Sequence, residues 1–207
     1  MYDLTLNIDS EQNGLTYVEP GIQENLFLGK LDGSYPIVYE ESKSGNEFIA
    51  FHFLNKEGQT FVHTEWVPKS DDTTILDKKN SNLTKRILHI AKKLVDESQL
   101  KFKVDTFEQL AKKIISIVGN SYKGKLFRCK VVLNNKNYTT FPNYVPFMES
   151  MDIPQEKSKL RLGASDKVIK SKADTIIVTS PNPFMATTPS GADGPNRSSQ
   201  NENDMPF

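Results

Sequence analysis

Residues 46–55, which read Asn-Glu-Phe-Ile-Ala-Phe-His-Phe-Leu-Asn, decide the fold class of this sequence. Successive side chains of a strand point to opposite faces, and here both sets are apolar or aromatic. The two faces are Ile49, Phe51 and Phe53 on one side and Phe48, Ala50 and His52 on the other. Residues 55–58 supply turn formers that lead into a second strand at 60–67. The sequence therefore predicts an aromatic-rich hairpin.

Strand patterns flank this hairpin on both sides of a helical region. A strand pattern at 25–31 precedes it, and two more follow at 125–133 and 138–141. Between them, apolar residues recur at helical spacing over 83–98 and 107–118. Three strands, a helical insert and two strands are the order of an OB-fold. We therefore expect a mainly β chain with a helical insertion (α+β), an OB-fold-like five-stranded barrel.

The second predicted helix has clear end signals. Thr106 and Gln109 have the spacing of a capping box, and Gly119 stands where a left-handed residue ends a helix. The first helix follows a polar run that extends to Asn82 and closes the β unit. The helical insert is accordingly predicted at about 82–119.

Composition divides the chain into three parts. Residues 1–153 form the predicted OB-like domain, and 154–179 a basic connector. Pro, Gly, Ser and Asn occupy 15 of the 28 positions in 180–207. Such a composition buries too little apolar surface to offset its ordering entropy, so we expect a disordered linker there.

The net charge of zero, from 26 Lys and Arg against 26 Asp and Glu, conceals a segregation. Residues 1–24 carry five acids and no base, which gives −5. Residues 25–153 carry 19 bases and 15 acids, and 154–172 carry six bases and two acids, which gives +4 for each. The last 35 residues carry one base and four acids, which gives −3. The chain is basic in its middle, as a polyanion partner requires, and acidic at both ends.

Membrane and secretory classes are not expected. No apolar run approaches the roughly 18 residues of a membrane span, and no secretory signal is recognisable at the start. A single cysteine, Cys129, suits a reducing compartment and alternates with apolar residues, so we expect it to be buried. The expected location is the cytoplasm.

Catalytic motifs are missing from the sequence. Phosphate-binding glycine motifs and the common zinc motifs do not occur, so neither a catalytic residue nor a cofactor is expected. His52, His63 and Glu65 form the one set that suits a metal, as in a small hydrolase. We favour the interpretation that these three are polar residues on a solvated face of the hairpin, so no metal site is predicted.

A mixture of cations and flat side chains is what binding of single-stranded DNA requires. If the apolar residues of 125–133 face the core, Arg128 and Lys130 point outward. Their expected cationic and polar neighbours are Lys30, Lys125 and Tyr138. The candidates for stacking on bases are Phe48, His52, Phe61 and Trp66.

The chain end carries the most specific signal. Residues 201–207 read Asn-Glu-Asn-Asp-Met-Pro-Phe, which joins acids to an apolar terminus. This end resembles the acidic tip of bacterial and phage single-stranded DNA-binding proteins, which typically ends in aspartates followed by Ile-Pro-Phe. The matching positions are Glu202, Asp204, Met205, Pro206 and Phe207. Asn201 and Asn203 depart from the pattern by diluting its charge.

The resemblance implies a divergent, phage-type protein that coats and protects single-stranded DNA during replication, recombination or repair. If it is phage-encoded, the expected cytoplasm is that of a bacterial host. It implies that the tip recruits partner enzymes of the polymerase, helicase, primase or recombinase class. A homo-oligomer is compatible with this, and a membrane partner is not expected. The alternative is a non-enzymatic adaptor that uses an OB-like sandwich to bind proteins. Titration with oligo-dT separates the two.

Overall fold

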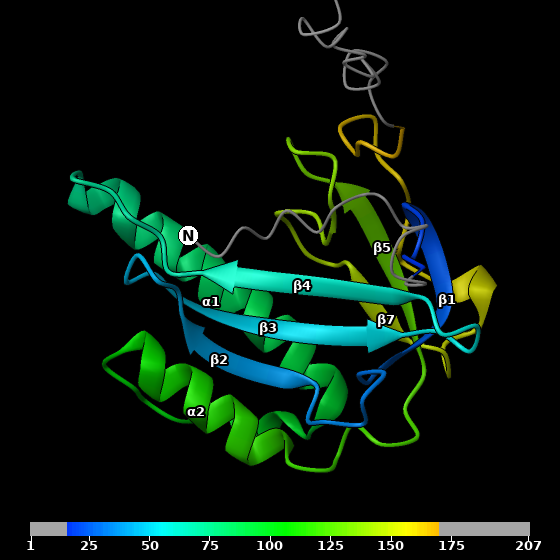
Figure 1. The fold of residues 1–207 in the computed structure, drawn as a ribbon, viewed down its shortest axis with the longest axis horizontal. Helices are drawn as coiled ribbons and strands as arrows, with labels where there is room; N and C mark the ends of the chain where they lie inside the picture. The colour runs from blue at the N-terminus through cyan, green and yellow to red at the C-terminus, as the bar shows by residue number, and fades with distance from the viewer. Residues whose placement is uncertain (1–15, 170–207) are drawn as a thin grey trace, which may run out of the picture. The chain divides into compact units, whose positions relative to one another are not determined.

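The computed structural model describes residues 16–169, which belong to a single compact unit. Its main feature is a curled antiparallel half-barrel sheet with two long helices (Figure 1). The strands are β1 (Gly21–Leu28), β2 (Ile37–Glu41), β3 (Glu47–Leu54), β4 (Thr60–Trp66), β5 (Phe127–Leu133), β6 (Thr139–Thr140) and β7 (Met148–Ser150). The helices are α1 (Thr73–Leu94) and α2 (Phe107–Val118), with short 3₁₀ turns η1 (Glu97–Leu100) and η2 (Gln155–Lys157). The expected mainly β, α+β class is confirmed, and the sheet is consistent with an OB-like fold.

The curl of the sheet originates in β1. Asn25 has a φ of 60°, and the strand register shifts between Gln23 and Leu26. An irregularity of this kind bends a strand and increases its twist, and Asn tolerates a positive φ better than most residues. β1 pairs with β5 from Gly21 to Leu26, across the bend, and its last residues, Phe27 and Leu28, pair with β3. One strand thus belongs to both halves of the curled sheet.

The predicted hairpin is the centre of the sheet. β3 pairs with β2 on one edge and with β4 on the other, and Gly58 in the turn has the positive φ of 77° that favours glycine. The predicted bounds of these two strands agree with the structure within a residue or so. β2 and β7 were not predicted, because each is short and combines apolar with polar residues, so neither shows a strand period.

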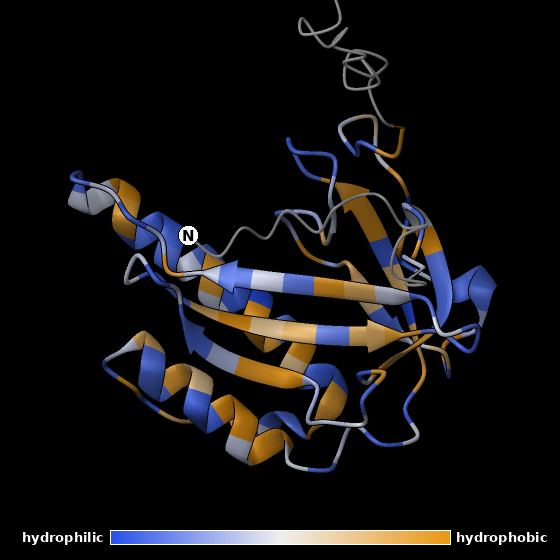
Figure 2. Ribbon diagram, in the orientation of Figure 1, coloured by the Kyte–Doolittle hydropathy of each residue, from blue (hydrophilic) through white to orange (hydrophobic). Residues whose placement is uncertain are grey.

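The helices cover one face of the sheet. α1 passes behind the strands and α2 runs along the β2 edge (Figure 1). Their apolar stripes pack with Ile49, Phe51 and Phe53 in one core, and the stripes are visible in Figure 2. Among residues 16–169, no helix combines the length and the apolar content that crossing a membrane requires.

The two helices differ in how well the sequence predicted them. α2 is confirmed with its ends: Thr106 Oγ1 accepts from the Gln109 N–H at 3.2 Å, and Gly119 has a φ of 44°. α1 begins ten residues before the predicted start, because Asp72 caps it by accepting from the Ile75 N–H at 3.1 Å. Its first turns are polar and exposed, so they carry no hydrophobic period.

The segment predicted as the start of a connector packs against the sheet. Leu160 is buried, and the Leu133 N–H donates to the Lys167 carbonyl at 2.7 Å. Every residue of β5 is buried, because one of its faces contacts the core and residues 155–167 lie against the other. The compact part of the chain thus continues beyond residue 153. The predicted linker at 180–207 lies outside the described residues.

Candidate nucleic-acid interface

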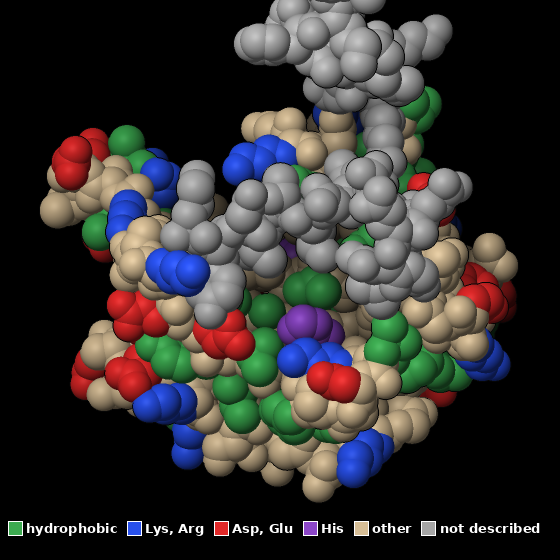
Figure 3. All heavy atoms as spheres, viewed as in Figure 1, with side chains coloured by type: hydrophobic (Ala, Val, Ile, Leu, Met, Phe, Trp, Pro, Cys, Tyr) green, Lys and Arg blue, Asp and Glu red, His purple; other side chains and the backbone are tan. Residues whose placement is uncertain are grey.

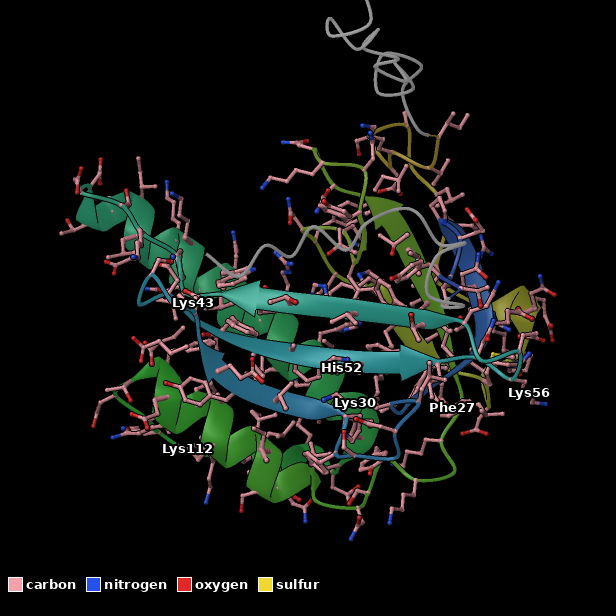
Figure 4. The ribbon with its side chains drawn as sticks, viewed as in Figure 1. Phe27, Lys30, Lys43, His52, Lys56 and Lys112 are labelled. Carbon is pink, nitrogen blue, oxygen red and sulfur yellow. The ribbon has the colours of Figure 1, made fainter. Side chains whose placement is uncertain are left out.

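The hairpin presents a second face that neither helix covers. We call it the open face and define it by Phe27, Val38, Phe48, Ala50, His52, Leu54, Val62, Thr64 and Trp66. These residues share one side of the sheet, since paired residues of antiparallel strands point the same way. Figure 3 shows a histidine with hydrophobic side chains around it on this face. His52 and Phe27 are labelled on it in Figure 4.

The apolar character of this face is unusual. A solvated face of an antiparallel sheet normally carries polar residues that alternate with the core residues. β3 is instead hydrophobic over nearly its whole length, with His52 as the break (Figure 2). Trp66 is the large apolar side chain of this face that is exposed, Ala50 and Leu54 are buried, and the other members are half-buried. A partly accessible apolar surface on a sheet face marks a candidate binding site.

Two aromatic side chains lie together at one end of the open face. Phe48 and Trp66 are paired across β3 and β4, and their ring centroids are 4.5 Å apart with an interplanar angle of 40°. Trp66 is 40% exposed, whereas Phe48 is half-buried beneath it. The indole therefore offers a free surface on a ring that its neighbour supports.

His52 lies at the middle of the face beside Lys30 (Figure 4). Burial and the positive charge of Lys30 lower the pKa of His52 to about 4, against a smaller opposing effect of Asp32. The imidazole is thus neutral at physiological pH. It contributes a flat ring, while Lys30 contributes the charge.

Further lysines edge the sheet. Lys43 lies in the turn between β2 and β3, and Lys56 lies in the turn between β3 and β4 (Figure 4). Glu40 and Asp32 are also exposed, so the edge is of mixed charge. Phe27, Lys43 and Lys56 were not among the predicted residues. Phe27 lay within a predicted strand and Lys56 in a predicted turn, whereas no element was predicted around Lys43. No local pattern indicates which turn borders which face of the sheet.

Phe61 is not on the open face. It pairs with Phe53 across the hairpin, is 1% exposed and packs with its ring centroid 4.9 Å from that of Phe141. Its candidacy as a stacking residue rested on residue type alone. The strand alternation directs it to the helix side, where it is part of the core.

The expectation that Arg128 and Lys130 point outward to solvent is wrong. Arg128 Nε lies 2.8 Å from Glu24 Oε1, and Arg128 Nη1 lies 2.7 Å from Glu149 Oε1. Lys130 Nζ lies 3.2 Å from Asp166 Oδ2. Both side chains do leave the core face of β5, but residues 150–167 cover them, and buried charges need such partners.

Arg128 and the carboxylates that it contacts stabilise each other's charged forms. The hydrogen bonds that Arg128 donates to Glu149 and Glu24 raise its pKa. Burial raises the pKa of Glu149, but hydrogen bonds from Ser158, Arg128 and the Lys159 N–H outweigh it and keep the pKa below its ordinary value. Both cations of β5 are therefore used within the fold.

Lys125 and Tyr138 also lie away from the open face. Lys125 Nζ donates to the Leu94 carbonyl at 2.8 Å, at the C-terminal end of α1. A lysine in this position satisfies a helix-end carbonyl and complements the helix dipole. Tyr138 is half-buried in the turn between β5 and β6.

His63 and Glu65 are buried rather than solvated, so that prediction is wrong for both. His63 Nε2 lies 2.7 Å from Glu65 Oε1, and Arg86 Nε lies 2.8 Å from the same oxygen. His63 Nδ1 lies 3.2 Å from Thr140 Oγ1, which ties β4 to β6. His52 points to the opposite face, so the three residues that were considered as a metal set do not converge. Within residues 16–169, no three metal-ligating side chains gather at one point.

The remaining predictions concern Cys129, the C-terminal tip and the residues that lie on the open face. Cys129 is buried as expected, and burial raises the pKa of its thiol. The tip residues Glu202, Asp204, Met205, Pro206 and Phe207 lie outside the described residues. The structure brings together Lys30, Phe48, His52 and Trp66 from the predicted set.

No known protein family matches the chain, and no curated protein matches its sequence.

Proposed function

We propose that the protein binds single-stranded DNA on the open face and performs no catalysis. The observation that supports this most directly is the apolar and aromatic face of the hairpin, uncovered by either helix and edged by lysines. Flat side chains receive the bases, and the cations at the edge attract the phosphates. Such contacts involve no base edges, so binding is tolerant of sequence.

Different residues of the open face contact the DNA strand at different points along it. A base stacks on the exposed side of Trp66, which Phe48 supports. The small side chains of Ala50 and Thr64 leave room for the strand at the centre, where His52 presents its neutral ring. Six residues separate Phe48 from Leu54, which at about 3.3 Å each gives a track of about 20 Å.

The same proposal includes the finer architecture. We take β1, β3, β4, β5 and β6 as the five strands of an OB-like barrel, with α1 and α2 between the third and fourth. The shared strand β1 and the His63–Thr140 contact between β4 and β6 support a closed arrangement. β2 and β7 are then additions to it. The acidic tip at 202–207 would recruit replication or recombination enzymes, as the resemblance implies.

Titration with fluorescent oligo-dT at several salt concentrations tests the proposal. Each phosphate that is neutralised contributes about 0.7 to the log-log slope. If Lys30 and Lys56 each neutralise one phosphate, the slope is about 1.4. Lys56→Ala should lower it by about 0.7, whereas Lys125→Ala should leave it unchanged, because Lys125 caps α1. No binding of the wild-type chain at low salt would refute the function.

One observation favours the alternative, a protein-binding adaptor. A groove lies between residues 102–104 and α2, with Phe102 and Val104 as its apolar part. Lys103, Lys112 and Lys113 line it as well. An acidic, apolar peptide suits such a groove. The adaptor becomes the better description if oligo-dT does not bind.

A further inference from the structure

A second group of exposed apolar side chains lies on the loop between β6 and β7 and on the segment after η2, which meet where Asp166 holds the Tyr144 hydroxyl. Tyr144, Val145 and Leu162 are exposed by 43%, 44% and 45%. Phe141 and Phe147 bound the loop, and their rings stack in the core with centroids 4.5 Å apart. The loop is thus anchored at both ends, and Tyr144 stands between the anchors.

The hydroxyl end of Tyr144 is held by charged groups. The hydroxyl donates to Asp166 Oδ1, and Lys130 Nζ lies 3.1 Å from the hydroxyl oxygen and 4.8 Å from the ring centroid. Asp166 in turn accepts from the Gly163 N–H at 2.7 Å and pairs with Lys130 at 3.2 Å. The exposed ring therefore has one fixed position.

The charges at this anchor are balanced. Burial raises the pKa of Asp166, but hydrogen bonds from Tyr144, Gly163 and Lys130 outweigh it, so the carboxyl stays ionised. Its negative charge is compensated by Lys130, whose side chain is itself buried. Desolvating such a pair costs about what its attraction returns. The Lys130–Asp166 pair therefore adds little net stability, but it holds the Tyr144 ring in a preorganised position.

One arginine near this loop is already paired. Arg86 Nη1 donates to Asn143 Oδ1 at 3.1 Å, next to Tyr144 in the chain, while its Nε lies 2.8 Å from Glu65. The cation that lies at the ring is Lys130, 4.8 Å from its centroid. A rigid, partly exposed ring beside a cation has the composition of a base-stacking site for single strands. Tyrosine suits this role because ordering its side chain costs little entropy.

We propose that Tyr144 is a second stacking platform, on which a nucleobase of single-stranded DNA stacks. This inference rests on the proposed function and assigns it a contact outside the open face. The Lys130–Asp166 pair acts through Tyr144 by positioning the ring.

Fluorescence anisotropy with oligo-dT tests the platform in the full-length chain. Tyr144→Ala should weaken binding about 5- to 100-fold, the range for one stacked base. Tyr144→Phe keeps the ring but loses its anchor, so its loss should be clearly smaller. Ile75→Ala, which trims an exposed apolar side chain on α1, is the matched control and should bind like the wild type. Circular dichroism verifies that each variant is folded.

A second measurement reads the contact directly. Oligo-dT that carries 5-iodouracil should form a photo-crosslink to the peptide that contains Tyr144. Wild-type-like affinity of Tyr144→Ala, or crosslinks confined to other peptides, would overturn the platform. If Trp66→Ala still weakens binding in that case, the proposed function stands without it. If the wild-type chain does not bind oligo-dT, both fall.

Discussion

Trp66 is the single residue on which the proposed interface depends most. Its ring is 40% exposed and supported by Phe48, and it is the only tryptophan of the chain. Stacking on one base is worth about 1–3 kcal/mol, so Trp66→Ala should weaken oligo-dT binding about 5- to 100-fold. The free energy of unfolding of the Trp66→Ala variant should differ from that of the wild type by less than about 1 kcal/mol. Quenching of the tryptophan fluorescence on DNA addition checks the contact in the wild type.

Phe61→Leu provides the opposite control. Phe61 is buried in the core, so this change should lower the free energy of unfolding by about 1–2 kcal/mol. The affinity of the folded protein for oligo-dT should not change. The interface assignment would be wrong if Phe61→Leu weakened binding and Trp66→Ala did not.

Two histidines make stability depend on pH. Burial and Lys30 lower the pKa of His52 to about 4, and burial and Lys93 lower the pKa of His89 to about 4. The unfolded chain takes up protons near pH 6.5 and the folded chain does not, so stability is complete above pH 6.5. It falls as the pH drops from 6.5 to 4, by up to about 1.4 kcal/mol per pH unit for each histidine.

Urea unfolding at pH 7.5, 6 and 5 measures this slope. The double variant His52→Gln/His89→Gln should flatten it, while a single variant should flatten it by half. Carboxylates contribute little in this range, because their ordinary pKa values lie near 4. An unchanged slope in the double variant would contradict the assignment of both neutral imidazoles.

At the scale of elements, Arg128 is a clamp between strands. It joins Glu24 of β1 to Glu149 of β7 across β5. Arg128→Met leaves Glu149 buried without its cation, so it should cost about 3–5 kcal/mol of stability. Arg128→Met/Glu149→Met removes both charges and should recover most of that loss.

The double variant also tests where DNA binds. Because the pair is buried, the folded double variant should bind oligo-dT as the wild type does, with the same salt slope. A clear drop in the slope would restore Arg128 as a phosphate contact. Urea unfolding and the oligo-dT titration give the two readouts on the same samples.

At the scale of the whole molecule, the C-terminal tip is expected to bind partners rather than DNA. Removing residues 199–207 takes away Glu202 and Asp204 together with the terminal Met-Pro-Phe. Affinity for oligo-dT should stay equal or become tighter, because negative charge is lost. Binding of a replication or recombination enzyme should disappear. A clear loss of DNA affinity would contradict this role for the tip.

Much of the fold followed from local sequence patterns. The central hairpin, the helix 107–118 with its Thr106 cap and the burial of Cys129 were predicted, because period and capping act over a few residues. The early start of α1 was missed, since an exposed helix has no apolar stripe and its Asp72 cap looks like a loop residue.

The site was predictable only by residue type. The alternation of β3 and β4 separates two aromatic faces, but both are apolar, so the sequence alone does not say which one the helices cover. That choice places Phe48 and Trp66 at the surface and Phe61 in the core. It depends on how α1 and α2 dock.

The two cations of β5 show the same difference between what a local pattern predicts and what the folded chain decides. The sequence by itself determined that Arg128 and Lys130 leave the core face of β5, because a strand alternates. Only the tertiary structure decided what lies there: Glu24 is 104 residues from Arg128, and Asp166 is 36 residues from Lys130. A charge is solvated or buried according to the groups that the folded chain brings beside it, and a local pattern carries no record of partners so distant.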